Sequence, residues 1–192
     1  MNIETLDGLS TVATELLLIA TGLTPNADRL AVDRYHGTSV EGIFALGDIS
    51  GSHQLKHVVN HESRVVKHNL IHPTDLIAAA HRFVPAAVFS DPQIASIGLT
   101  EQQAAGRGVS YVAIVQKYAD ITADWARRHS AFPERAGRPG HGHLLGAHVI
   151  GPEAATIIQP LTQAMSFDQS AHQVARGQYW IHPALSKLVE NA

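Results

Sequence analysis

The sequence GIFALGDI, residues 42–49, contains a short apolar run that ends in a Gly-Asp pair. We expect residues 42–46 to form a buried strand that presents the Asp48 carboxylate at its carboxyl end. In open α/β sheets, ligands bind in the crevice outside such strand ends. The carboxylate could accept hydrogen bonds from ribose or ribityl hydroxyls there, although a Gly-Asp pair taken alone is more often a simple turn.

The residues before this run predict two further strands. We expect them over residues 3–7 and 12–20, joined by a turn at Gly8. The unbroken apolar stretch at 16–19 is typical of a strand that is buried on both faces of a sheet. Three short signals then follow in order, Ala20-Thr21-Gly22, Pro25-Asn26 and Thr38-Ser39.

This ordered set resembles the flavin-binding signature of the class I pyridine-nucleotide disulfide oxidoreductases. Two more stretches resemble the same family. Residues 84–101, VPAAVFSDPQIASIGLTE, are similar to the start of its dimerisation domain. Residues 177–191, GQYWIHPALSKLVEN, are similar to its C-terminal end, and they closely resemble the branch that reduces mycothiol disulfide.

A helix is expected over residues 55–70, soon after Asp48. Its apolar residues recur at roughly helical spacing, and they are Val58, Val59, Val65, Val66 and Leu70. A helix N-terminus favours negative charge, such as the charge of a reduced flavin. The resemblance therefore implies that FAD contacts Gly47, Asp48 and the first residues of this helix, which are Leu55, Lys56, His57 and Val58.

Two histidines of this helix, His57 and His61, raise the question of a metal site. They lie four residues apart on one face, as zinc-binding pairs do. The HExxH motif would need a glutamate at Val58, the inverted HxxEH motif would need one at Asn60, and no third ligand is evident. We therefore expect no metal site.

The second half of the chain predicts mixed strands and helices. We expect strands over residues 82–89, 93–98, 111–117 and 143–150, and helices over 153–167, 170–176 and 183–191. A further helix should begin at Thr100 with a capping box that uses Gln103, and Pro160 should kink or break its own helix. The predicted fold class is α+β, with a remnant of the FAD- and NADPH-binding α/β region followed by a dimerisation domain.

Two stretches of this half carry further expectations. Helical spacing unites Ile157, Ile158, Leu161 and Met165, with Tyr179 and Trp180 following nearby. We expect these residues to form an apolar face for a second copy, the alternative being the core of the chain itself. Residues 126–140, ARRHSAFPERAGRPG, hold two prolines and four arginines and so make a poor strand. A solvated loop and a shifted reading frame both explain that stretch.

The C-terminal string places His182 before a proline, at the expected start of the last helix. Imidazole can both donate and accept a proton near neutral pH. The resemblance implies that His182 is the acid–base residue of disulfide reduction and that it acts in the active site of the partner subunit. The family usually has a glutamate where Lys187 stands, and a lysine there would disfavour a positively charged ring.

The resemblance also implies an organisation and a reaction. Residues 1–22 would end an NADPH-binding domain, residues 23–75 would belong to the FAD-binding region, and residues 76–192 would form the dimerisation domain. The intact enzyme would use FAD and NADPH to reduce mycothiol disulfide in thiol redox homeostasis. Its partner would be a second copy, or a separately encoded N-terminal half. The alternatives are a non-catalytic dimerisation module and another reductase of the family.

Composition narrows the function further. The 192 residues contain no cysteine and no GxGxxG loop, so we expect the chain alone to be inactive and to retain neither cofactor tightly. An apolar content of 45% fits a globular core, and a net charge of −3 gives no electrostatic case for nucleic acid or an anionic membrane. No apolar run has the length of a membrane span and no leader opens the chain, so we expect a cytoplasmic protein.

Overall fold

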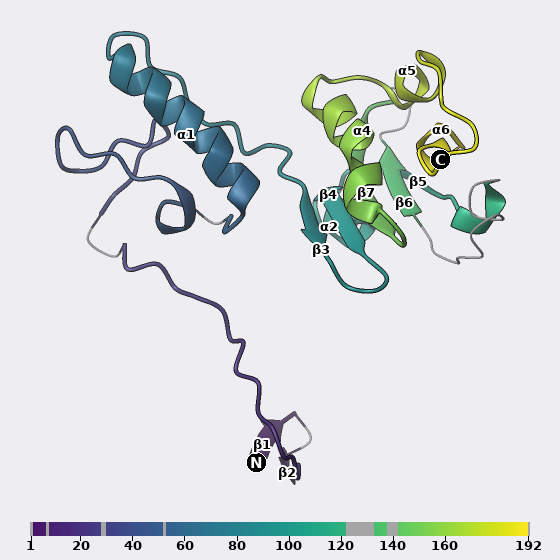
Figure 1. Cartoon of the computed structure of the whole chain (residues 1–192), viewed down its shortest axis with the longest axis horizontal. Coiled ribbons are helices and arrows are strands. Elements are labelled where there is room, and N and C mark those ends of the chain that lie inside the picture. Colours follow the sequence, from purple (N-terminus) through teal and green to yellow (C-terminus); the bar gives the residue numbers. More distant parts are fainter. Residues whose placement is uncertain are drawn as a thin grey trace.

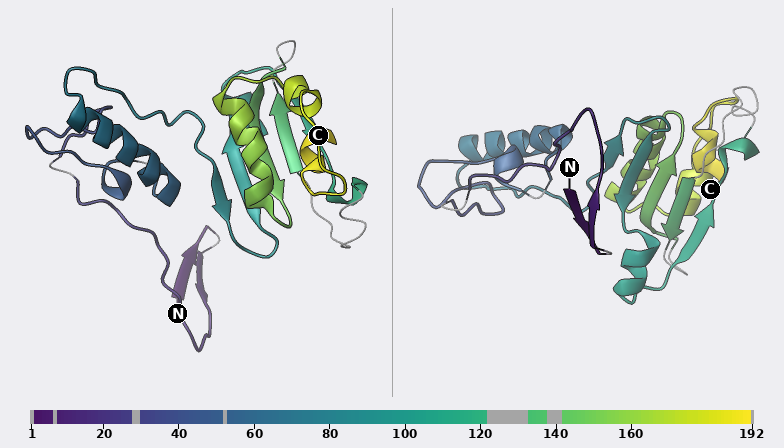
Figure 2. Two further views of the ribbon diagram at one scale, coloured as in Figure 1. Left: turned by 45° about the horizontal axis from the view of Figure 1, so that its top comes forward. Right: turned by 90° about the horizontal axis from the view of Figure 1, so that it is seen from below.

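The structure is a computed structural model that describes residues 2–6, 8–27, 30–51, 53–121, 133–137 and 142–191. Figures 1 and 2 show three parts in chain order, namely an N-terminal hairpin, a segment built around the long helix α1, and a sheet covered by helix α4. No helix among the described residues is both long and apolar enough to cross a bilayer.

The N-terminal part is a two-stranded hairpin. Strands β1 (Asn2–Thr5) and β2 (Gly8–Thr11) pair antiparallel. The strand expected over residues 12–20 does not form, and that prediction was wrong. Leu16 and Leu18 are each 88% exposed, since the described residues place no sheet beside them. An apolar run suited to a strand between two neighbours stays irregular when neither neighbour is there.

Helix α1 (Lys56–Ile71) confirms the helix expected after Asp48. The buried residues of its inner face include Val58, Val65 and Val66, whereas Leu70 is 59% exposed, contrary to expectation. The strand expected over residues 42–46 is reduced to an isolated bridge between Gly37 and Phe44. A short 3-10 helix, η1 (Gly47–Ile49), then leads towards α1.

The third part is a five-stranded antiparallel sheet with the order β3-β4-β7-β6-β5. Four of its strands confirm the expected positions, and they are β3 (Ala86–Val88), β4 (Ile94–Gly98), β5 (Val112–Val115) and β7 (Leu144–Ile150). Helices and an antiparallel sheet in one chain confirm the α+β class.

The fifth strand, β6 (Pro133–Gly137), lies between β5 and β7, inside the stretch that we expected to be a poor strand. Pro133 occupies the first position of the strand, where proline is tolerated. A register irregularity between Ala136 and Gly137 marks the other end. The expectation was therefore wrong for residues 133–137, and residues 126–132 and 138–140 lie outside the described part of the chain.

Helix α4 (Ala154–Ser166) packs on the sheet and supplies much of the core. Its apolar residues Ile157, Ile158, Leu161 and Met165 are buried against sheet residues of the same chain, so they do not form a face for a second copy. The helix runs through Pro160 without a break. Proline removes the hydrogen bond to the carbonyl of Thr156, but Thr156 is exposed and water can take its place.

The remaining helices are short, and two of them begin with a capping box. Thr100 and Gln103 form the expected capping box of α2 (Glu101–Gly106), and Ser170 and Gln173 form another at α5 (Ala171–Arg176). A 3-10 turn, η2 (Tyr118–Asp120), follows β5. The last helix, α6 (Lys187–Asn191), is shorter than the expected 183–191, because the residues before it form turns.

Candidate functional site

The turn that carries Asp48 is fixed by two features of its neighbour, Gly47. Gly47 has a φ of +77°, and a Cβ atom there would lie 3.1 Å from the Val59 side chain, so only glycine fits without strain. The Gly47 amide donates a hydrogen bond of 2.6 Å to Glu62 Oε2. Asp48 is exposed and its carboxylate has no hydrogen-bond partner among the described residues, so it is free to accept from a ligand.

The first turn of α1, which follows the Asp48 turn in the chain, has no side-chain cap and two unpaired backbone amides among the described residues. Leu55 is the N-cap residue and offers no side-chain cap, and no acidic residue lies in the first turn. The amides of Lys56 and His57 have no partner among the described residues, whereas the Val58 amide donates to Leu55 O at 3.0 Å. Two open amides and the helix dipole suit a negatively charged group. Of the expected flavin contacts, Gly47 and Val58 already use their amides within the chain.

The side chains of His57 and His61, the two α1 histidines considered for a metal site, have partners outside the helix. His57 Nε2 lies 2.8 Å from the Pro85 carbonyl oxygen, so the start of α1 is tied to the chain just before β3. His61 Nε2 accepts a weak hydrogen bond of 3.4 Å from the Ala80 amide. Each histidine therefore has its own partner in the connecting segment.

The C-terminal site brings His182 and Lys187 together. Both line a cavity of about 240 Å³ whose walls include Asp120 and Ile121. His182 is exposed and precedes α6 by several residues, so it does not start the helix as expected. Lys187 Nζ donates to Glu190 Oε2, an interaction that offsets the lysine charge beside the histidine.

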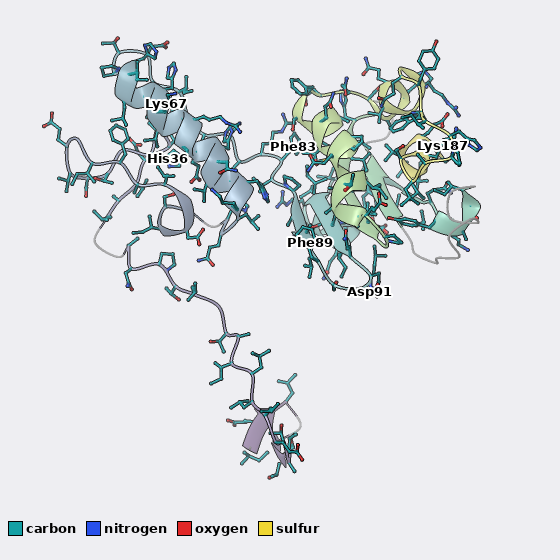
Figure 3. All side chains as sticks on the ribbon, viewed as in Figure 1. His36, Lys67, Phe83, Phe89, Asp91 and Lys187 are labelled. Atoms are coloured by element: carbon teal, nitrogen blue, oxygen red, sulfur yellow. The ribbon has the colours of Figure 1, made fainter. Side chains whose placement is uncertain are left out.

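The two candidate sites lie on different parts of the chain. Figure 3 shows Lys187 at the C-terminal helix, on the far side of the sheet part from α1. The Asp48 turn belongs to the α1 part. Within the described residues of one chain, His182 therefore does not approach the Asp48 turn.

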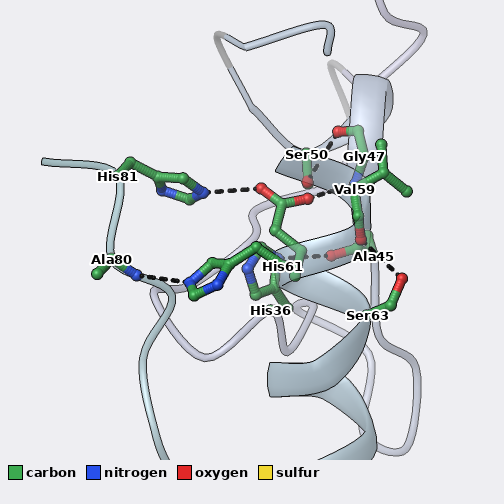
Figure 4. Close-up of polar contacts among 10 residues, drawn as sticks. His36, Ala45, Gly47, Ser50, Val59, His61, Ser63, Ala80 and His81 are labelled. Carbon is green, nitrogen blue, oxygen red and sulfur yellow. Dashed lines mark hydrogen bonds and ion pairs between the residues drawn. The ribbon is translucent and has the colours of Figure 1, made fainter. Parts of the chain in front are cut away.

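One polar cluster was missed by the sequence analysis. His36, Glu62 and His81 converge beside α1, with ligand atoms within 4.8 Å of one another (Figure 4). A signal existed for Glu62, because it shares the helical spacing of the buried residues Val58 and Val65. No pattern in the sequence indicates that two residues from irregular segments meet it.

Comparison with known proteins identifies the family. Residues 84–192 match the family model for the pyridine nucleotide-disulphide oxidoreductase dimerisation domain. This chain is a member of that family. It is 48% identical to mycothione reductase from Mycobacterium tuberculosis, over 97% of this chain and 45% of that protein. It is 32% identical to dihydrolipoyl dehydrogenase from Mycobacterium bovis, over 92% of this chain and 41% of that protein.

Solved structures share the fold of this chain. LpdA from Mycobacterium tuberculosis superimposes with a TM-score of 0.85 at 23% identity, over 100% of this chain and 44% of that chain. The HOCl-induced flavoprotein disulfide reductase RclA from Escherichia coli gives a TM-score of 0.77 at 21% identity, over 84% and 37%. The chain spans less than half the length of these relatives.

Proposed function

We propose that this oxidoreductase chain is the C-terminal part of an NADPH- and FAD-dependent enzyme that reduces mycothiol disulfide. The observation that carries the proposal is the 48% identity to mycothione reductase over 97% of the chain. In this proposal residues 1–22 end the NADPH-binding domain, residues 23–75 complete the FAD-binding region and residues 76–192 form the dimerisation domain.

The α1 part would hold one side of the flavin. Asp48 would accept hydrogen bonds from ribityl hydroxyls, and the left-handed backbone of Gly47 shapes the turn that presents the Asp48 carboxylate. The open amides of Lys56 and His57 would face negative charge on the pyrimidine side. When bound, FAD would relay electrons from NADPH to a redox-active pair of cysteines. The chain contains no cysteine, so that pair must come from outside these residues.

His182 would move the proton. Reduction of a disulfide releases a thiolate, which leaves more readily as the thiol, so an imidazole that donates a proton assists the step. Exposure of His182 suits this role in a site on the partner subunit. Lys187 does not assist this role, because it offers no carboxylate to orient the His182 imidazole.

The second candidate is a dimerisation module without catalysis. Lys187 beside His182 and the lack of any cysteine favour it. A chimera separates the two candidates: this chain replaces the matching segment of an intact mycothione reductase, which supplies the cysteines and the missing cofactor contacts. NADPH oxidation is then measured with mycothiol disulfide and with lipoamide.

Each outcome of the chimera experiment has a clear meaning. Turnover that prefers mycothiol disulfide and is lost in His182→Ala supports the proposal. A folded, flavin-loaded dimer whose turnover is unchanged by His182→Ala assigns the chain to the non-catalytic module. A preference for lipoamide would assign it to the dihydrolipoyl dehydrogenase branch.

A further inference from the structure

Three side chains with metal-binding chemistry meet beside α1, outside the proposed flavin contacts. His36 is 4% exposed and Glu62 is 1% exposed, whereas the His81 side chain is 35% exposed at the rim. One ligand atom from each lies within 4.8 Å of the other two. In Figure 4 a dashed line joins the His81 imidazole to the Glu62 carboxylate, and another joins His36 to the Ala45 carbonyl.

One ring nitrogen of His36 is buried and has no hydrogen-bond partner among the described residues. Its Nδ1 lies 3.0 Å from the Ala45 carbonyl oxygen, and since a carbonyl only accepts, Nδ1 carries the proton. Nε2 therefore holds a lone pair, and it is buried without a hydrogen-bond partner among the described residues. Metal-bound histidines commonly donate their second nitrogen to a backbone carbonyl in this way.

Both carboxylate oxygens of Glu62 are in hydrogen-bond contact with other residues. Its Oε2 accepts from the Gly47 amide at 2.6 Å, and its Oε1 lies 2.9 Å from His81 Nε2. Oε1 retains lone pairs that a cation could use. The buried carboxylate supplies the negative charge, and a cation would replace the contact between Glu62 Oε1 and His81 Nε2 by bonds to both atoms.

The surroundings suit a small cation. The cluster lines a cavity of about 250 Å³ that also includes Asp33, Arg34 and His53. The Arg34 guanidinium stacks 4.7 Å from the centre of the Tyr35 ring, and the described residues show no ion pair between Arg34 and Glu62. The His53 ring centre lies 5.9 Å from that of His81, close enough for a small movement to add another nitrogen.

We propose that His36 Nε2, Glu62 Oε1 and His81 Nε2 bind a zinc ion, with the fourth position taken by water or His53. Zinc prefers tetrahedral sites of nitrogen and carboxylate oxygen, with bonds of about 2.0–2.1 Å that put ligand atoms about 3.3 Å apart. The three ligand atoms lie within 4.8 Å of one another, so they would have to move closer together to bind the ion. The ion would also brace the Gly47 turn, because Glu62 is bonded to both.

The test is zinc binding by the full chain, measured by isothermal titration calorimetry after chelator treatment. We expect one tight ion, and a loss of at least about a hundredfold in affinity in His36→Gln and in His81→Gln. The matched control is His172→Gln, an exposed histidine on α5, which should bind as the parent chain does. Zinc should also raise the Tm of the parent and of the control, but not of the two variants.

Each result of this titration decides the proposal. Should the buried His36→Gln variant fail to fold, the rim variant His81→Gln decides alone. No tight ion in the parent would overturn the site, and so would equal affinity in the parent and His81→Gln. Weak binding of several ions, equal in every variant, would mean scattered surface histidines and would also overturn it. None of these readouts depends on flavin or on disulfide reduction.

Discussion

Glu62 Oε2 accepts a hydrogen bond from the Gly47 amide at 2.6 Å, which ties the middle of α1 to the turn that carries Asp48. The carboxylate is 1% exposed and has His81 as its second partner. A buried carboxylate with charge-assisted bonds is stabilising only while its partners are present. The geometry of the proposed flavin contact therefore depends on a residue that does not itself reach the flavin.

Replacement of Glu62 should loosen this part of the chain. Glu62→Ala leaves the Gly47 amide unpaired and opens a cavity, so the local free energy of unfolding should fall by about 2–4 kcal/mol. Amide hydrogen exchange of α1 in the presence of a chelator measures the change without any metal contribution. Glu41→Ala is the control, because Glu41 is exposed. Equal exchange rates in both variants would show that the contact contributes nothing.

Asn69 fastens the other end of α1. Its amide group donates to the carbonyls of Tyr35 at 3.0 Å and Ile77 at 2.9 Å, and its Oδ1 accepts from the Ile77 amide. Asn69→Ala leaves buried backbone groups unpaired and should cost about 2–3 kcal/mol. Asn60→Ala, on the exposed face of the same helix, should change stability by less than about 0.5 kcal/mol. Hydrogen exchange of α1 distinguishes the pair.

Gly146 permits the close crossing of β7 and the end of β4. A Cβ atom at Gly146 would lie 2.0 Å from the Leu99 carbonyl oxygen, so the backbone would have to move. Gly146→Ala should destabilise the sheet by about 3 kcal/mol or more. Gly106→Ala is the matched control, since a Cβ there meets nothing within 4 Å. Urea unfolding can be followed by tryptophan fluorescence in a background that carries Trp125→Phe, so that Trp180 alone reports; a tolerated Gly146→Ala would contradict the prediction.

Local patterns predicted the elements that local forces build. Helix α1 and the strands β4 and β7 follow from apolar periodicity, and the Thr100 capping box follows from its spacing to Gln103. The contacts that stabilise these elements come from residues a few positions away or from neighbouring elements of the same chain. The prediction of their positions was accordingly confirmed within a few residues.

The wrong predictions concern what packs against or pairs with an element, which the local sequence pattern does not specify. The apolar run at 16–19 was assigned a sheet that the described residues do not provide, and the apolar residues of α4 were assigned a second copy although the sheet covers them. Strand β6 was rejected for its composition, yet pairing from β5 and β7 on both sides holds its backbone. Tertiary context overrides propensity most easily in strands.

One candidate site could be predicted from local sequence, whereas the other could not. The Gly47-Asp48 turn and the start of α1 are contiguous, so their sequence predicted their proximity. The cluster of His36, Glu62 and His81 joins a loop, a helix and a connecting segment, and no spacing rule links them. That cluster could be recognised only from the structure.

Because the apolar face of α4 is buried, we now expect an exposed tyrosine and an exposed isoleucine to contact a second copy. Tyr179 is 103% exposed and Ile181 is 78% exposed, on either side of Trp180, which packs against the core. We expect the chain to form dimers, and Tyr179→Ser with Ile181→Asp should weaken them at least about a hundredfold. Leu70→Asp, at an exposed site on α1, is the control. Light scattering decides, and a monomeric parent chain would refute the prediction.

The last prediction concerns Lys187, which shares a cavity with His182 and is paired with Glu190. In the chimera described above, Lys187→Glu should raise turnover of mycothiol disulfide by about ten- to a hundredfold. A carboxylate at this position can orient the imidazole and stabilise its protonated form, and acid–base catalysis is worth roughly a hundred- to ten-thousandfold. Adding His182→Ala should abolish the gain.

Lys187→Gln separates the two ways in which the lysine could interfere. Glutamine removes the positive charge but brings no carboxylate, so it should recover only a small part of the gain. Equal rates for Lys187→Gln and Lys187→Glu would mean that repulsion of a charged ring is the whole effect. Equal rates for Lys187→Glu and the unmodified chimera would mean that Glu190 already neutralises the lysine, and that residue 187 does not govern the histidine. Steady-state kcat and KM for the four chimeras distinguish these outcomes, because an acid–base role changes kcat more than KM.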